Sequence, residues 1–226
     1  MIRLAIALVA LATPVAAQST FSLPANCTAY LTVQMRSCTV SHHFTCSNDP
    51  DGNQRRVDLN QDGMIYAGEI DSETQWISSF RPATGDTETL ESRPANPASL
   101  TELLETGVNE YDFRTQSTDT GTTRYVGTDR LTGKTVTIDG ETLQQTEYTI
   151  RALNPDGSEQ WRSAGNEFIS AEWRMFLSGT STVVTPNDTF TTDDTPMQFI
   201  KPGEPGFLSS SPKFGCNAVL SSWEGN

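Results

Sequence analysis

The sequence predicts an all-β protein with minor α content, in which an antiparallel β-meander forms a curved sheet or half-barrel with one short amphipathic helix. Three observations predict it. Threonine, a β-branched residue that suits strands, accounts for 31 of the 226 residues. Apolar and polar residues alternate in several segments, as they do in half-buried strands. Turn signals rich in Pro, Asp and Gly recur between those segments.

Turn sequences set the boundaries of the expected strands. Residues 49–52 and 154–157 both end in Pro-Asp-Gly, where Pro presets φ and Gly accepts a positive φ. Asp139-Gly140 lies between two β-rich runs and predicts a two-residue hairpin. Each of these sites is therefore expected to reverse the chain.

Two more reversals are expected, at residues 118–121 and 131–134. Together with the other turns they divide the chain from Tyr111 to Val184 into about six antiparallel strands. Alternation within this meander predicts which side chains enter the core. The expected core residues are Val136, Ile138, Tyr148, Ile150, Phe168, Trp173, Met175 and Leu177.

One helix is predicted between residues 99 and 107. Asn96-Pro97 precedes it, Ser99 and Glu102 match a capping box, and Gly107 ends it. Its apolar face consists of Leu100, Leu103 and Leu104. Because a sheet with one apolar face must curl on itself or be covered, we expect this helix to lie on the sheet.

The N-terminus predicts export. Arg3, an apolar run from Leu4 to Ala12 and small residues before Gln18 form the three parts of a cleavable signal peptide, residues 1–17. The remainder, residues 18–226, is expected to fold as one antiparallel β domain with an irregular C-terminal tail. No later run is long enough to predict a transmembrane segment. The expected localisation is periplasmic or secreted.

The charge of the chain excludes some partners. Lys and Arg total 15 and Asp and Glu 28, and removal of Arg3 with the signal leaves a net charge of -14. A chain of this charge is repelled by phosphate, so nucleic acid is not an expected partner.

Four cysteines follow the signal, which in an exported chain predicts two disulfides with three possible pairings. Cys38 and Cys46 flank an expected strand, so they lie too far apart to pair, and the same holds for Cys27 and Cys38. A reversal at residues 36–37 places Cys27 opposite Cys46. We therefore favour Cys27–Cys46 and Cys38–Cys216.

The segment from Asp58 to Glu69 fits the EF-hand calcium-loop pattern, with Gly63 at the bend. The expected ligands are the side chains of Asp58, Asn60, Asp62 and Glu69, the carbonyl of Met64 and a water at Tyr66. The preceding residues contain Pro50 and Gly52, which do not favour an entering helix. We therefore favour a hairpin turn at residues 60–63, and calcium remains the alternative cofactor.

No catalytic residue is predicted. His42 and His43, the two histidines, are neighbours on an expected strand, so they face opposite sides and cannot chelate one metal together. A hydrolase remains an alternative in which either histidine meets a Ser or a carboxylate in a cleft. The four tryptophans could stack on sugars, but packing in the core or on a sheet face is the favoured interpretation. They are Trp76, Trp161, Trp173 and Trp223.

The order of elements from Leu31 to Ile200 resembles that of uncharacterised exported proteins of Gram-negative bacteria. It also resembles, more distantly, the curved half-barrels of periplasmic lipoprotein carriers, which shelter acyl chains in a concave apolar sheet. The cysteines depart from the carrier pattern, and no binding residue is carried over from it.

The resulting hypothesis is a non-enzymatic envelope protein that binds an apolar small molecule or a protein partner on a concave sheet face. It predicts a pocket lined by meander residues such as Tyr148, Ile150, Phe168 and Trp173. A calcium-stabilised extracellular module that uses residues 58–69 is the first alternative, and a secreted hydrolase is the second.

Overall fold

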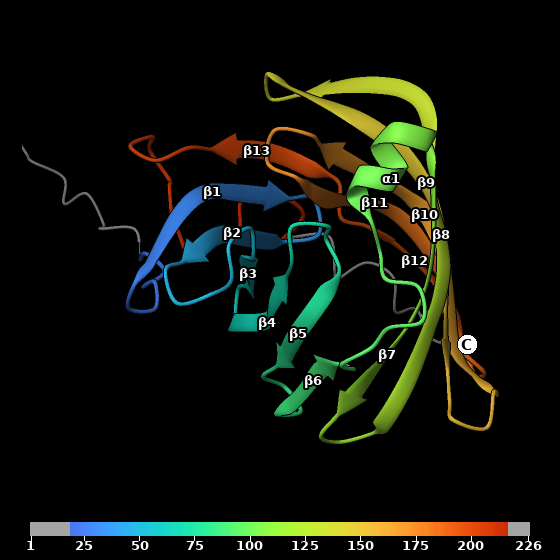
Figure 1. Ribbon diagram of the computed structural model, residues 1–226. Coiled ribbons are helices and arrows are strands. Elements are labelled where there is room, and N and C mark those ends of the chain that lie inside the picture. Colours follow the sequence, from blue (N-terminus) through green and yellow to red (C-terminus); the bar gives the residue numbers. More distant parts are fainter. Residues whose placement is uncertain (1–18, 217–226) are drawn as a thin grey trace, which may run out of the picture.

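A computed structural model describes residues 19–216. The described chain forms one antiparallel sheet and a single short helix, α1 (Leu100–Thr106) (Figure 1). The strands of the first half are β1 (Cys27–Met35), β2 (Thr39–Cys46), β3 (Gln54–Asn60), β4 (Gly63–Ile70), β5 (Trp76–Arg81) and β6 (Asp86–Leu90). The strands of the second half are β7 (Val108–Ser117), β8 (Gly121–Ile138), β9 (Glu141–Leu153), β10 (Glu159–Ser170), β11 (Met175–Val184), β12 (Thr189–Asp193) and β13 (Pro196–Ile200).

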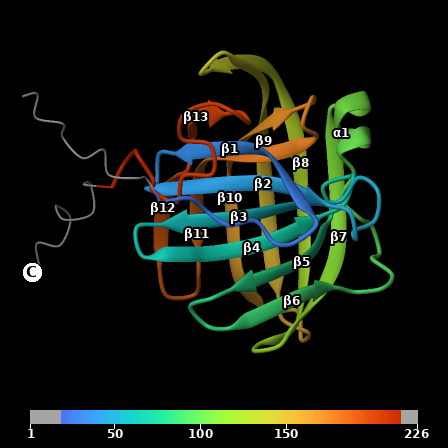
Figure 2. The ribbon, with the colours of Figure 1, turned by 90° about the vertical axis from the view of Figure 1, so that its left-hand side faces the viewer.

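The predicted curved meander is confirmed. Strands β1 to β12 pair with their chain neighbours, and β13 pairs with β1, so β12 and β13 are the two edges of the sheet. Only residues 194 and 195 separate β12 from β13, a link that spans no more than roughly 11 Å. The two edges therefore meet at that end, and the sheet is rolled around an interior. Figure 2 shows the strands of the first half crossing in front of those of the second half.

One expected reversal is wrong. Residues 131–134 lie inside β8, where the pairing with β9 shifts between Leu131 and Thr135. The segment is an irregularity within one long strand, so the chain from Val108 to Val184 contains five strands of the sheet. Gly133 has a φ of 76°, which a bulge accommodates as readily as a turn does. The other turns lie between strands as predicted.

The helix forms where the sequence predicts it. Ser99 is the N-cap and accepts a hydrogen bond from the backbone of Glu102, and Gly107 ends the helix with a φ of 85°. Leu100 and Leu103 are buried and pack with Ile169. The helix therefore covers one end of the space between the two halves of the sheet (Figure 2).

A second apolar cluster fills another part of the interior. Side chains of β1 and β13 pack there against β9, β10 and β11. Its buried members are Leu31, Val33, Met35, Leu143, Phe168, Met175, Leu177 and Phe199. Val136, Ile138 and Trp173 are partly buried against it, as expected of core residues.

The outer face of the first strands is covered by the two ends of the described chain. Phe21, Leu23, Phe207 and Leu208 pack there against the buried side chains of β1 to β3. The disulfide Cys27–Cys46 connects β1 to β2, and Cys38–Cys216 connects the turn between β1 and β2 to the C-terminal end of the described chain. This pairing is the one favoured from the sequence. The expected signal peptide, Gln18, Trp223 and the end of the C-terminal tail lie outside the described residues.

Candidate ligand-binding cavity

The rolled sheet encloses a cavity of about 390 Å³. Its walls come from strands β2 to β11, from Thr74 between β4 and β5, and from Ala98, two residues before α1. Because side chains alternate along each strand, every second residue of these strands faces inward. Cross-strand pairing then places the inward residues of neighbouring strands side by side, as in Tyr125, Ala152 and Trp161.

Aromatic rings form one wall of the cavity. Trp76 meets the edges of Phe113 and Tyr125, with ring centroids 5.6 and 5.2 Å apart, and Tyr125 lies 6.0 Å from Trp161. Ile150 packs in the same cluster. Trp76 is 43% exposed, so this wall reaches solvent at the mouth of the cavity. The arrangement provides an apolar aromatic surface for an organic ligand.

Two glycines make room for tyrosines on the inner face. A Cβ at Gly127 would overlap the phenol of Tyr111, and a Cβ at Gly68 would overlap the phenol of Tyr66. Both tyrosines line the cavity. The absence of a side chain at each glycine therefore lets a phenol lie flat along the inner wall.

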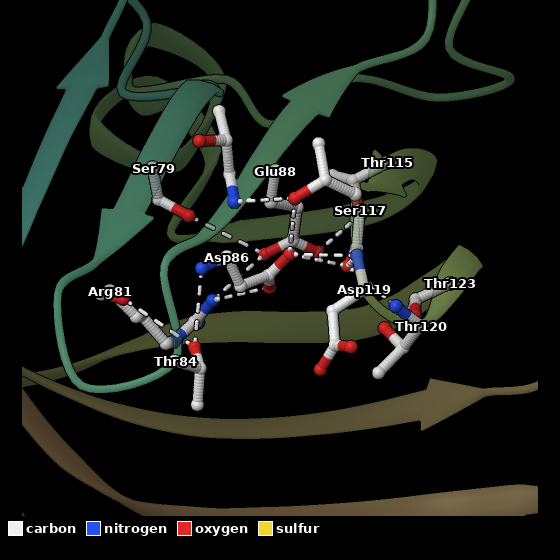
Figure 3. Close-up of polar contacts among 12 residues, drawn as sticks. Ser79, Arg81, Thr84, Asp86, Glu88, Thr115, Ser117, Asp119, Thr120 and Thr123 are labelled. Atoms are coloured by element: carbon white, nitrogen blue, oxygen red, sulfur yellow. Dashed lines mark hydrogen bonds and ion pairs between the residues drawn. The ribbon is translucent and has the colours of Figure 1, made fainter.

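Glu88 is a buried acid whose carboxylate oxygens both accept hydrogen bonds. It is 7% exposed and accepts hydrogen bonds from the hydroxyls of Thr115 and Tyr125, the latter at 2.8 Å. Arg81 donates to its other oxygen at 3.4 Å. Figure 3 shows Glu88 with Thr115, Arg81 and the neighbouring Asp86. Glu88 therefore has its charge and its hydrogen bonds satisfied within the protein.

Arg56 is a second charged group on the inner wall. Its Nε lies 3.2 Å from Oδ1 of Asp58, although the two atoms are not aligned as a hydrogen bond. The guanidinium lies over the ring of Tyr66, 4.9 Å from its centroid. Its side chain is surrounded by protein yet 38% accessible, because that surface faces the cavity. The positive charge of Arg56 is thus compensated by Asp58 and Tyr66.

Asp129 and Glu167 differ from Glu88. Both line the cavity, and no group among residues 19–216 donates a hydrogen bond to either carboxylate or forms an ion pair with it. Burial raises the pKa of Asp129 to about 7. Burial, and then the charge of Asp129, raise the pKa of Glu167 to about 8, against the opposing effect of Arg56. These two acids therefore face the cavity without a partner among the described protein groups.

The histidines lie on opposite faces of β2, as expected. His42 stacks on Phe21 under the chain ends and bonds the hydroxyl of Thr32. His43 lines the cavity. Its Nε2 is buried without a hydrogen-bond partner in the described residues. Burial, and then the charge of Arg56, lower its pKa to about 3, so His43 is neutral at physiological pH.

The calcium-loop pattern lies in a hairpin. Asn60 pairs with Gly63 at the turn between β3 and β4, and Asn60 Oδ1 accepts hydrogen bonds from the backbones of Asp62 and Gly63. Glu69 lies at the far end of β4, bonded to Arg55 and Asn53. Within residues 19–216, no set of three or more His, Cys, Asp or Glu side chains is placed to hold a metal ion.

The predicted pocket residues are divided between the cavity and the core. Tyr148 and Ile150 line the cavity, whereas Phe168 and Trp173 belong to the apolar cluster of β1 and β13. Glu167 alternates with Ser163 and Gly165 along β10, in regular pairing with β9, and lies on the cavity wall. Trp76 and Trp161 line the cavity as well, on the inner face of the sheet, whereas Trp173 packs against the core.

The charged cavity residues were not predicted. A signal existed for Asp129, because Tyr125, Gly127 and Asp129 alternate along one strand and so share a face. An acid on the face that carries Tyr125 must be buried or face a cavity. Glu167 carried the same kind of signal, because Ser163, Gly165 and Glu167 alternate along one strand. Arg56 offered no comparable signal, because its approach to these acids depends on how the sheet rolls up.

No protein-family model, curated protein or solved structure matches this chain. In the part of the chain that the structure describes, no helix is long and apolar enough to cross a membrane. The two disulfides fit a secreted or periplasmic protein.

Proposed function

We propose that this protein is an exported, non-enzymatic binding protein that holds a small organic molecule inside its rolled sheet. The cavity carries the proposal: about 390 Å³ of space, walled by aromatic rings and by a few buried polar groups, has the size and character of a small-molecule site. The resemblance to lipoprotein-carrier half-barrels supports the same role, with the difference that this interior carries charged groups. A purely apolar occupant would leave Asp129 and Glu167 without partners.

A hydrolase is the less supported alternative. His43 is the cavity histidine, and as a general base it would have to accept a proton near neutral pH. Its pKa of about 3 opposes that role. Calcium binding by residues 58–69 stays a prediction, which a thermal melt with and without a chelator tests.

Binding of a neutral fluorescent dye tests the proposed function. We expect N-phenyl-1-naphthylamine, which brightens in apolar surroundings, to bind the purified protein with saturable affinity. Ser79 lies on the inner wall beside Gly68, so Ser79→Trp places a large ring in the cavity and should abolish dye binding. Ser92→Trp, at an exposed position in the loop before α1, is the matched control and should bind as the wild type does.

The melting temperatures of both variants show whether the fold is retained. A wild-type protein that produces no increase in dye fluorescence would contradict the proposal. So would a folded Ser79→Trp variant that binds the dye with unchanged affinity.

A further inference from the structure

We propose that the ligand of this cavity is an organic cation, a primary ammonium group on an apolar body, held by the carboxylates of Asp129 and Glu167. This inference rests on the proposed function and names its ligand class. The ammonium would lie between the two acids, and its apolar body would lie along the aromatic wall towards Trp76.

The first argument is the unpartnered state of Asp129. Its side chain is enclosed, with 7% exposure, and it lines the cavity. No group among the described residues bonds its carboxylate. Buried acids in folded proteins normally have hydrogen-bond partners, as Glu88 has in this same cavity. The missing partner of Asp129 is therefore expected to come from a ligand.

The second argument is that the two acids share one part of the cavity. Asp129 on β8 and Glu167 on β10 interact electrostatically, and Tyr111 interacts with both. Tyr148, opposite Asp129 across the β8–β9 pair, lies in the same region and hydrogen-bonds Ser163 at 2.8 Å. A primary ammonium has three N–H donors in a compact group. Two carboxylates and a phenol oxygen are suitable acceptors for them.

Charge favours a cation over an anion. Arg56 acts electrostatically on Glu167, but Asp58 and Tyr66 already compensate its charge. An anion would add charge beside two acids that have no counterion, which costs free energy in a buried site. The net charge of the whole chain, -13, also raises the local concentration of cations at the mouth.

The aromatic walls favour an organic cation. Tyr66, Tyr111, Tyr148 and Trp161 line the cavity with the two acids, and their ring faces attract a cation that has left water. An ammonium on an apolar body would satisfy the acids at one end and cover the exposed face of Trp76 at the other.

Proton release gives this inference a distinctive signature. Without a bound cation, the pKa values of Asp129 and Glu167 lie at about 7 and 8, and a bound cation lowers both. The groups that face them are Arg56, Tyr111, Tyr148 and the neutral His43. Binding should therefore release protons near pH 7, and the affinity should rise from pH 6 to pH 8.5.

Matched ligands test the charge preference. We would titrate the full mature chain by calorimetry with butylamine, octylamine, 2-phenylethylamine and tryptamine, each beside its alcohol or carboxylate analogue. We expect at least one amine to bind at least about tenfold more tightly than its neutral and anionic analogues. Titration in two buffers with different ionisation enthalpies should show proton release. Equal affinity for the alcohol, or preference for the carboxylate, would overturn the inference.

Isosteric variants test the residues. Asp129→Asn and Glu167→Gln should each weaken amine binding at least about tenfold, while binding of the neutral dye stays within about twofold. Asp51→Asn and Glu105→Gln, at exposed positions, are the matched controls. Unchanged amine affinity in folded Asp129→Asn and Glu167→Gln proteins would refute the inference.

The dye separates the two proposals. If the dye binds and none of the four amines does, the cation inference fails and the proposed function stands. If neither the dye nor any amine binds, both fail.

Discussion

Asp129 is a residue whose burial costs stability. An unfolded chain loses the proton of this acid near pH 3.8, the ordinary value, whereas the folded protein keeps it until about pH 7. The raised folded pKa means that the unfolded state gains stability relative to the folded state as pH rises through this window. The loss of folding free energy reaches its full value above about pH 7. Such a cost is typical of a group retained for binding.

Asp129→Asn should therefore stabilise the protein at pH 8 by up to about 4 kcal/mol and change little at pH 4. The amide keeps the shape of the acid and never ionises. Urea unfolding at the two pH values measures the difference. The exposed Asp51→Asn variant should show no such pH-dependent gain. Equal effects of Asp129→Asn at pH 4 and pH 8 would show that Asp129 ionises normally in the folded protein.

At the scale of elements, Glu73 fixes helix α1 to the sheet. Its carboxylate accepts hydrogen bonds from Ser99 Oγ, from Thr101 Oγ1 and from the Thr101 backbone. Arg174, in the turn between β10 and β11, pairs with the same carboxylate at 2.9 Å. Burial alone would raise the pKa of Glu73, but the bonds from Thr101 and Ser99 and the charge of Arg174 hold it below its usual value. Glu73 thus joins its own loop between β4 and β5 to the start of α1 and to the turn between β10 and β11.

Glu73→Gln should lower the free energy of unfolding at pH 7 by about 1–2 kcal/mol, because the charge-assisted bonds to the helix start and to Arg174 are lost. The depressed pKa makes this contribution disappear as the pH falls below the ordinary value near 4.5. Thermal melts at pH 7 and pH 3.5 measure it. Glu105→Gln, on the exposed side of the helix, is the control. A loss of unfolding free energy equal to that of the control would mean that the bonds of Glu73 to the start of the helix do not stabilise the fold.

The elements also show how far the sequence determines this fold. Local chemistry specified the hairpin at Asp139-Gly140 and the helix between Ser99 and Gly107, because caps and tight turns depend on neighbouring residues alone. The segment 131–134 has the composition of a turn but forms a bulge in β8, since the long pairing of β8 with β9 outweighs the local preference. A turn and a bulge both use Gly at positive φ.

The site was harder to predict than the fold for a related reason. Tyr148 and Ile150 alternate on one strand, so their shared face was predictable. The opposing half of the cavity, with Arg56 and His43, approaches them only when the sheet rolls up. Glu167 alternates with Ser163 and Gly165 along β10, so its face was predictable as well, but its approach to Arg56 depends on the same rolling of the sheet. Contacts that depend on the curvature of the whole sheet leave little local signal.

At the scale of the whole molecule, the two ends of the described chain form a layer over the outer face of β1 and β2. The backbone of Leu208 donates to the hydroxyl of Thr32, and the backbone of Lys213 donates to Oε1 of Gln34. Thr32 and Gln34 are fully buried, so this layer supplies partners that water would otherwise provide. Cys38–Cys216 fastens the layer to the turn between β1 and β2.

The two disulfides should therefore contribute unequally. Cys38–Cys216 closes a loop with a sequence separation of 178, against 19 for Cys27–Cys46. In the chain-entropy model the longer loop removes more disorder from the unfolded state, about 5 kcal/mol against about 3 kcal/mol. We expect the double variant Cys38→Ser/Cys216→Ser to lose more stability in urea than Cys27→Ser/Cys46→Ser. The reverse order would show that strain or residual structure outweighs loop length.

The same variants test whether stability and binding are separable. Both disulfides lie with the outer layer, whereas the cavity is built from inward residues of β2 to β11. The Cys38→Ser/Cys216→Ser protein, once shown to be folded by its circular dichroism and a cooperative melt, should bind the neutral dye with wild-type affinity. Loss of dye binding in that folded variant would mean that the outer layer holds the sheet in its rolled form. The shape of the cavity would then depend on the packing of the outer layer, and the Cys38–Cys216 disulfide would be required for ligand binding as well as for stability.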